Sequence, residues 1–234
     1  MSVMLLFLAG IAAIVIWWMS QQRLTSRPWL EVGHLGQPGG GERSPIPPAK
    51  IGLYVFLGVV GALFSLFISA YLMRVGTPDW WSTPIPRLLW LNTATLIVSS
   101  AAMHWAKTEA QRSRGGTMRT ALLAALATAI LFLTGQVFAW RELTEAGYVL
   151  ADNPANSFFY VITGMHGLHI LGGLVALGRT IMKTGGGPVT AKARLSVDLC
   201  ALYWHFMLVV WLVLFALFAG WANDFADLCR QLLT

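Results

Sequence analysis

Charged residues are scarce in this chain of 234 residues. Asp, Glu, Lys and Arg together make up 11% of it, whereas an ordinary soluble domain carries roughly 25%. Hydrophobic residues make up 56%, and the mean hydropathy is +0.64. This composition leaves little room for a soluble domain, and it predicts an all-α protein that crosses a membrane several times.

Cysteine and basic clusters are also lacking. The two cysteines, Cys200 and Cys229, form no metal-binding motif and no disulfide framework. The N-terminus lacks the basic segment that opens a secretory signal peptide, so we expect residues 1–20 to stay in the chain as a membrane helix. The formal net charge of +6 does not indicate a nucleic-acid partner, because the basic residues are spread over short loops.

Acidic residues are missing from the middle of every predicted membrane helix. All ten lie in loops, at helix ends or in the C-terminal tail. Proton relays and ion pathways inside membranes typically use buried Asp, Glu or His. Because no carboxylate, Lys or Arg is expected at mid-membrane, a self-contained pump or ion-coupled transporter is disfavoured.

Six long apolar segments remain, and about 20 apolar residues are enough to cross a bilayer as a helix. The predicted spans are residues 3–19, 51–73, 88–106, 119–140, 158–179 and 199–221. We therefore expect a fold of six transmembrane helices: an N-terminal helix within 1–20 and a five-helix bundle over 51–222. Residues 21–50, rich in Gly and Pro, are predicted to form a loop, and 223–234 a short tail.

The positions of Lys and Arg predict the orientation. The N-terminal tip has none, the five loops that follow have four, two, four, one and four, and the tail has one. Cytoplasmic loops carry the excess of basic residues. This alternation fits six helices with both termini outside the cytoplasm and with the loop 21–50 inside it.

Histidines are the polar residues that invite a functional interpretation. His166 and His169 are three residues apart and share one helix face. With His205 as a third ligand they fit a metal site, and a bis-histidine heme between the last two helices is a second possibility. The alternative is that each imidazole hydrogen-bonds a neighbouring helix. HxxH without the carboxylate of HExxH is a weak motif, so the residues alone favour packing.

Small and polar residues inside the spans predict close helix packing. Glycines around the histidines let a neighbouring helix approach, and we expect a bulky residue at Gly167 or Gly172 to weaken the association. Asn92 and Gln136 are placed to hydrogen-bond across helices, each for about 0.6–2 kcal/mol. The residues assigned to packing are Asn92, Gln136, Gly164, His166, Gly167, His169, Tyr203, Trp204 and His205.

Two motifs together carry a family resemblance. The fifth predicted helix contains FFYVITGMHGLHILGGL, and the sixth contains YWHFMLVVWLVLF. Both resemble helices of subunit III of the heme–copper terminal oxidases. Upstream, LNTATLIVSSAAMHWA, FLTGQVF and KIGLYVFLGVVGALFSLFISAYL are similar to further helices of that family in the same order. The resemblance covers about residues 50–220.

The resemblance implies a non-catalytic subunit of a respiratory oxidase that reduces oxygen to water in a bacterial inner (plasma) membrane. Such a subunit binds no heme or copper itself, packs on subunit I with subunit II nearby, holds phospholipid in a cleft between helices, and supports proton uptake and stability. The family histidines that match His166, His169 and His205 are not metal ligands, and Lys183 matches a basic residue suited to a lipid phosphate. Alternatives are an accessory protein of nitric oxide reductase and an independent heme- or metal-binding protein.

Three departures from the family pattern concern carboxylates. The entry helix of relatives often carries Glu where this chain has Val60, and the glutamine helix often carries Glu where Ala139 stands. The family motif YWHFVD reads YWHFML here, which puts Leu208 at the place of the Asp. Roles that relatives assign to these carboxylates therefore do not carry over.

Overall fold

The computed structural model describes residues 47–75, 77–81, 83–184 and 189–220. They form five α-helices: α2 (Pro48–Arg74), α3 (Leu88–Gln111), α4 (Gly115–Glu145), α5 (Pro154–Lys183) and α6 (Ala191–Phe218). Each contains most or all of one predicted span of the five-helix bundle. The predicted N-terminal helix within 1–20, the loop as far as residue 46 and the tail 223–234 lie outside the described residues.

The helices extend beyond the predicted spans, and in α5 and α6 a polar residue caps the longer N-terminal end. Asn153 accepts a hydrogen bond from the backbone N–H of Ala155, and Pro154 fills the first helical position of α5. Thr190 caps α6 in the same way. α2 begins at Pro48, within the segment expected to be a loop, because proline is tolerated in the first turn of a helix.

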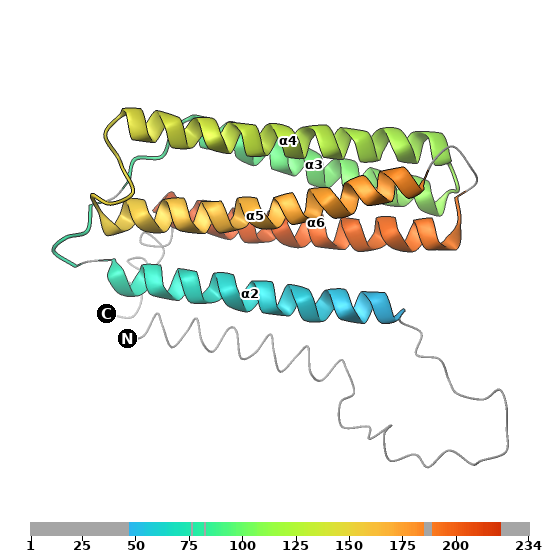
Figure 1. The fold of residues 1–234 in the computed structure, drawn as a ribbon, viewed down its shortest axis with the longest axis horizontal. Coiled ribbons are helices and arrows are strands. Elements are labelled where there is room, and N and C mark those ends of the chain that lie inside the picture. Colours follow the sequence, from blue (N-terminus) through green and yellow to red (C-terminus); the bar gives the residue numbers. More distant parts are fainter. Residues whose placement is uncertain (1–46, 76, 82, 185–188, 221–234) are drawn as a thin grey trace, which may run out of the picture. The chain divides into compact units, whose positions relative to one another are not determined.

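In the bundle of five described helices (Figure 1), α3 has the most extensive contact with its neighbours. It packs most extensively against α4, to which residues 112–114 connect it, and then against α6. α5 packs against both α4 and α6, and α2 runs along α5 and α6. Short connections between consecutive helices make these neighbours antiparallel, so the bundle has two ends where the loops gather.

Four of the described helices, α2, α4, α5 and α6, are long and apolar enough to cross a membrane. α3 was expected to span as well but does not reach the same hydropathy, because buried polar residues such as Asn92, Ser99 and Ser100 interrupt it. These side chains face other helices, not lipid, which is where polar groups in membrane bundles are found. The low hydropathy of α3 therefore reflects polar residues that neighbouring helices cover.

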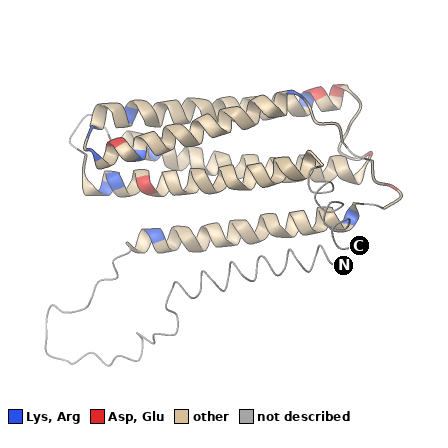
Figure 2. Cartoon of the chain, turned by 180° about the vertical axis from the view of Figure 1, so that it is seen from behind, with Lys and Arg blue, Asp and Glu red and all other residues tan. Residues whose placement is uncertain are grey.

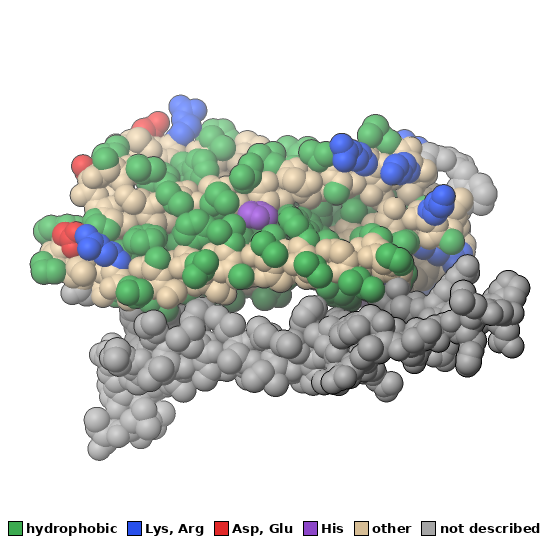
Figure 3. All heavy atoms as spheres, turned by 60° about the horizontal axis from the view of Figure 1, so that its bottom comes forward, with side chains coloured by type: hydrophobic (Ala, Val, Ile, Leu, Met, Phe, Trp, Pro, Cys, Tyr) green, Lys and Arg blue, Asp and Glu red, His purple; other side chains and the backbone are tan. Residues whose placement is uncertain are grey.

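Charges gather at the two ends of the bundle (Figure 2). The end formed by the 112–114 turn and the start of α6 carries nine Lys and Arg but only Glu109 and Asp198 among the described residues. The opposite end carries Arg74, Arg87 and Arg141 with four acids. Between them the visible face in Figure 3 is mostly apolar, as a lipid-facing surface must be.

Candidate functional site

Hydroxyl and indole groups join α3 to both of its main neighbours. Ser99 donates to the backbone carbonyl of Ala125 in α4 at 2.9 Å and accepts from the Trp204 indole of α6 at 2.9 Å. Thr93, six residues before Ser99 in α3, accepts a second hydrogen bond from α6, in which the indole of Trp211 donates at 3.0 Å. All these groups are buried, so each hydrogen bond satisfies a donor that would otherwise be stranded in an apolar interior.

Asn92 and Gln136, both predicted as packing residues, meet across α3 and α4. The amide of Asn92 donates to the side-chain oxygen of Gln136 at 3.4 Å. The neighbouring Gly135 makes room for this contact, because a Cβ at that position would overlap the Asn92 side chain. The Nε2 of Gln136 has no hydrogen-bond partner among the described residues.

His166 is completely buried between α5 and α6. Its Nε2–H donates to the backbone carbonyl of Met207 at 3.1 Å, which is a bond between helices. The rings of Trp211 and Phe132 pack around it with centroids 4.9 and 5.7 Å away. Its Nδ1 has no partner in the described part of the chain.

His169, three residues on, is held differently. Its Nδ1–H donates to the carbonyl of Met165 in its own helix at 2.7 Å, and its ring packs against Phe64 of α2 with centroids 5.5 Å apart. The cross-helix bond at this level comes from the backbone, because the hydroxyl of Tyr203 donates to the His169 carbonyl at 2.6 Å. Tyr203 thus ties α6 to α5.

His205 turns toward α3. Its Nδ1 lies 2.8 Å from the hydroxyl of Ser100, and its Nε2 lies 3.5 Å from Nδ1 of His104. The three histidines whose spacing suggested a shared metal therefore have separate partners on different helices. Across the described ranges, no three His, Cys, Asp or Glu side chains come close enough to hold a metal ion.

The glycines of α5 differ in what surrounds them. A Cβ at Gly173 would come within 2.6 Å of Tyr203 and 3.0 Å of Trp204, so α6 packs tightly against α5 there. At Gly164 and Gly167 the nearest neighbours, Trp140 and Leu133, would be at ordinary contact distances of 3.6 and 3.7 Å. At Gly172 nothing lies within 4 Å, so the expected contact there is not present.

An apolar cavity of about 370 Å³ lies between α2, α5 and α6. Leu53 and Phe56 line it from α2, Gly172 from α5, and Leu199 and Tyr203 from α6. Lys183, the residue predicted to bind lipid, does not line the cavity and is exposed in the last turn of α5. It lies seven residues, roughly 10 Å of helix, beyond the last α5 residue of the cavity.

Asp198 connects three helices at the basic end. One carboxylate oxygen lies 3.0 Å from Lys50 of α2, and the other lies 2.7 Å from Lys107 of α3. The three side chains are partly exposed. A carboxylate shared by two lysines leaves one net positive charge at this membrane boundary.

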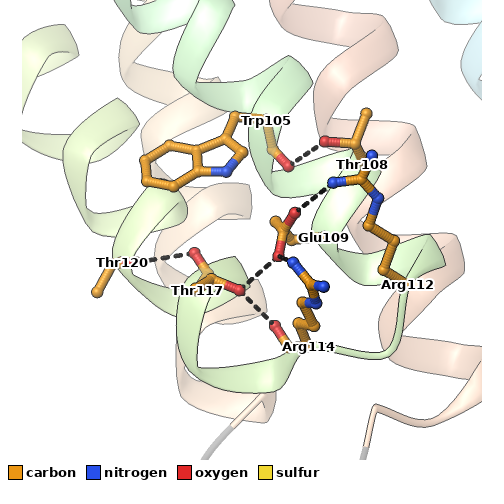
Figure 4. Close-up of polar contacts among 7 residues, drawn as sticks. All are labelled: Trp105, Thr108, Glu109, Arg112, Arg114, Thr117 and Thr120. Atoms are coloured by element: carbon orange, nitrogen blue, oxygen red, sulfur yellow. Dashed lines mark hydrogen bonds and ion pairs between the residues drawn. The ribbon is translucent and has the colours of Figure 1, made fainter.

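Glu109 organises the turn between α3 and α4 (Figure 4). Its carboxylate accepts from Thr117 at 2.6 Å and from Arg112 at 3.2 Å, and Arg114 is 3.9 Å away. The residue is only 3% exposed although both arginines extend into solvent. The hydrogen bond from Thr117, followed by those charges, lowers the pKa of the carboxyl group below its ordinary value.

The positions of the absent family carboxylates are filled by apolar side chains. Val60 and Ala139 are buried, and Leu208 is half-buried. A carboxylate buried at either of the first two positions would need a hydrogen-bond donor or an opposite charge beside it.

These features define a helical membrane protein whose buried polar groups serve helix contacts. Its sequence matches the family model described as cytochrome c oxidase subunit III over residues 56–223. Cytochrome c oxidase subunit 3 of Thermostichus vulcanus is 33% identical over 172 residues, which cover 71% of this chain and 84% of that protein. The chain belongs to the cytochrome c oxidase subunit III family.

Other relatives agree with this assignment. Cytochrome c oxidase subunit 3 of Synechocystis sp. is 34% identical over 172 residues, covering 71% of this chain and 72% of the relative. A probable cytochrome c oxidase subunit 3 of Mycobacterium bovis is 30% identical over 156 residues, covering 65% and 76%. The resemblance carried by the last two helices is confirmed.

Sequence reasoning missed several of the residues that matter in this geometry. His104 had no assigned role, although it pairs with His205. The prediction named Gly172 as a helix contact, whereas the close contact is at Gly173. Asp198 and Glu109 were recognised only as helix-end acids. Which face of a helix meets a neighbour depends on the arrangement of all five helices, so local spacing gave no signal for these contacts.

Proposed function

We propose that this chain is the non-catalytic subunit III of a bacterial respiratory heme–copper oxidase that reduces oxygen to water and pumps protons. The observation that carries the proposal is the family match, which includes nearly all of the five described helices. The location proposed is a bacterial inner membrane, and the relatives whose length this chain covers most fully are bacterial.

Within that complex, the chain packs on subunit I and lies near subunit II, while hemes and copper belong to those partners. Support comes from the histidines: His166 and His205 use ring nitrogens in helix contacts, and His169 bonds its own helix. This chain then takes no direct part in the redox chemistry; it stabilises subunit I and supports proton uptake. Because Val60, Ala139 and Leu208 replace family carboxylates, that support does not use these three positions.

Phospholipid binding belongs to the same proposal. The cavity between α2, α5 and α6 has the apolar lining that an acyl chain requires. Lys183 stands at the basic end of α5, at a height where a lipid phosphate would lie. A lipid with its phosphate at Lys183 and one chain in the cavity would fill the space between these helices.

The same proposal includes six transmembrane helices and both termini outside the cytoplasm. The concentration of Lys and Arg at the end formed by the 112–114 turn supports placing that end in the cytoplasm. On this orientation α3 spans the bilayer despite its lower hydropathy.

Copurification tests the assignment. The tagged chain is purified in mild detergent from the cells that produce it, and its partners are identified by mass spectrometry, heme spectra and oxygen consumption. We expect an oxygen-reducing heme–copper subunit I in stoichiometric amount, and unchanged heme content in the His166→Ala variant. Partners that reduce nitric oxide would favour the nitric oxide reductase alternative, and heme bound to the isolated chain would overturn the non-catalytic role.

A further inference from the structure

A second hollow, with a volume of about 540 Å³, lies between α4 and α5. Its lining is almost entirely apolar, with Leu133, Val137 and Phe138 from α4 and Leu171 from α5. Leu168 is shared with the cavity between α2, α5 and α6, but the rest of the lining differs. We refer to this hollow as the α4–α5 groove. It has no part in the proposed function.

The floor of the α4–α5 groove contains small residues. Gly164 and Gly167 both line it, and their neighbours Trp140 and Leu133 are no closer than ordinary contact. The absence of side chains at two positions three residues apart on one face is what keeps the groove open. A slender apolar group fits such a trough.

One end of the groove carries a cation. Arg141 lines it, is exposed, and forms no ion pair with any residue that the structure describes. It lies eight residues from Leu133, which corresponds to roughly 12 Å of helix. Arg141 lies near the C-terminal end of α4, at the less basic end of the bundle.

A hydrogen-bond donor without a partner lies between that cation and the apolar end. Gln136 lines the groove, is 2% exposed, and has a free Nε2 in the described part of the bundle. A buried donor without an acceptor is costly, so an acceptor supplied by a ligand would be favourable. Arg141 and the Nε2 of Gln136 therefore favour a ligand with anionic and carbonyl oxygens that accept hydrogen bonds, and not a ligand that donates them.

We propose that the α4–α5 groove binds one phospholipid, with its phosphate on Arg141, its ester carbonyl level with Gln136, and an acyl chain over Gly164 and Gly167. A phospholipid places an anion, a carbonyl and a hydrocarbon chain in this order from the membrane boundary inward. A transmembrane helix from a partner would fill the apolar part but would need an acid at one defined depth to satisfy Arg141. This site is separate from the lipid cavity of the proposed function and does not depend on oxidase activity.

Photo-crosslinking locates the lipid. The full chain, or its intact complex, is reconstituted in vesicles containing phosphatidylglycerol with a diazirine in one acyl chain, irradiated and digested, and the labelled peptides are quantified by mass spectrometry. We expect labelling of 133–141 and 164–171. Arg141→Gln should lower it about fivefold, the loss expected for one basic contact at the headgroup. Thr134→Trp, which fills the groove from an exposed position, should lower it at least as much.

Matched variants serve as controls. Arg87→Gln removes an arginine at the same end of the bundle, and Ile130→Trp adds bulk to α4 one turn away, outside the groove. Both should leave groove labelling unchanged, and excess inorganic phosphate should not displace the lipid. Labelling of α2 and α6 around the first cavity should persist in every variant, which separates failure of this site from failure of the first.

Three results would overturn the proposal. One is groove labelling that neither Arg141→Gln nor Thr134→Trp reduces. Another is an unlabelled groove in a chain whose α2 and α6 are labelled. The third is an intact complex in which residues 133–141 crosslink to a partner chain and no lipid is found there.

Discussion

Neutral polar side chains, not ion pairs, join the buried parts of the helices. Ser99 is bonded to α4 and α6 at once, and His166 bonds the backbone of α6. Neutral donors of this kind contribute about 0.6 kcal/mol each on average inside membranes, without the large desolvation cost of a charge. The ionised groups are kept for the bundle ends, where water and lipid headgroups solvate them.

Glu109→Gln is expected to destabilise the α3–α4 turn at neutral pH. The substitution removes the negative charge that faces Arg112 and Arg114, while Thr117 keeps an oxygen to bond. Thermal unfolding of the detergent-purified protein, followed by tryptophan fluorescence, measures the loss. Glu142→Gln, an exposed acid of α4, is the matched control and should have little effect.

The pH dependence of the same variant pair gives a sharper result. The folded-state pKa of Glu109 is lowered, so its contribution to stability is present above the ordinary glutamate value of about 4.5 and is lost as the pH falls through the folded-state pKa. The difference between wild type and Glu109→Gln should therefore shrink in acid. A difference that stays constant down to pH 3, or that grows, would show that the ionised carboxylate is not what stabilises the turn.

At the residue scale the sequence predicts the kind of interaction better than its partner. Asn92, Gln136 and Tyr203 were selected because polar groups in a membrane span seek other helices, and each has such a contact. His169 bonds its own helix, and the partner of His205 includes the unassigned His104. Side-chain rotation and helix register decide these details, and neither is encoded in residue spacing.

At the level of the helices, α3 and α5 have features that hydropathy alone does not predict: how buried α3 is, and where α5 begins. Of the five described helices, α3 has the lowest hydropathy, because it carries several polar residues. Neighbouring helices cover these residues, so hydropathy alone understates how buried α3 is. The existence of all five described helices followed from apolar length and turn residues. Their true ends did not: Asn153 and Thr190, for example, cap α5 and α6 and begin these two helices before the apolar segment.

Gly173→Ala and Gly172→Ala form a paired test of helix approach. Both substitutions raise intrinsic helix propensity by about 1 kcal/mol, so that gain is common to the two. Only Gly173→Ala brings a Cβ within 2.6 Å of Tyr203, and such overpacking costs about 1–3 kcal/mol. Chemical or thermal unfolding should show Gly173→Ala less stable than Gly172→Ala by that amount; equal stabilities would mean that α5 and α6 are not in tight contact there.

Over the whole molecule the two ends of the bundle differ in charge. Nine basic residues gather at one end of the described bundle, and most of the acids gather at the other. The loop counts in the sequence predict this separation because Lys and Arg mark cytoplasmic loops. Cavities could not be predicted in this way, since they depend on how three helices diverge and on residues that are far apart in the chain.

Cysteine accessibility tests the orientation and the crossing of α3 together. In a background lacking Cys200 and Cys229, single cysteines replace the exposed residues Pro78, Gln111 and Asp152. We expect a membrane-impermeant maleimide to label Pro78→Cys and Asp152→Cys in intact spheroplasts, and Gln111→Cys only after lysis. Labelling of Gln111→Cys without lysis would mean that α3 does not cross the membrane in the proposed direction.

The carboxylate of Asp198 also sets an order of events during synthesis. Lys50 and Lys107 emerge from the ribosome with α2 and α3, long before α6 supplies the group that both of them contact. Until then the two ammonium groups have no shared anion, and this end of the bundle lacks its connection between α2 and α3. The last of the described helices to be translated is thus the one that joins the earlier two, so a nascent chain that stops after α5 lacks this ion-pair connection.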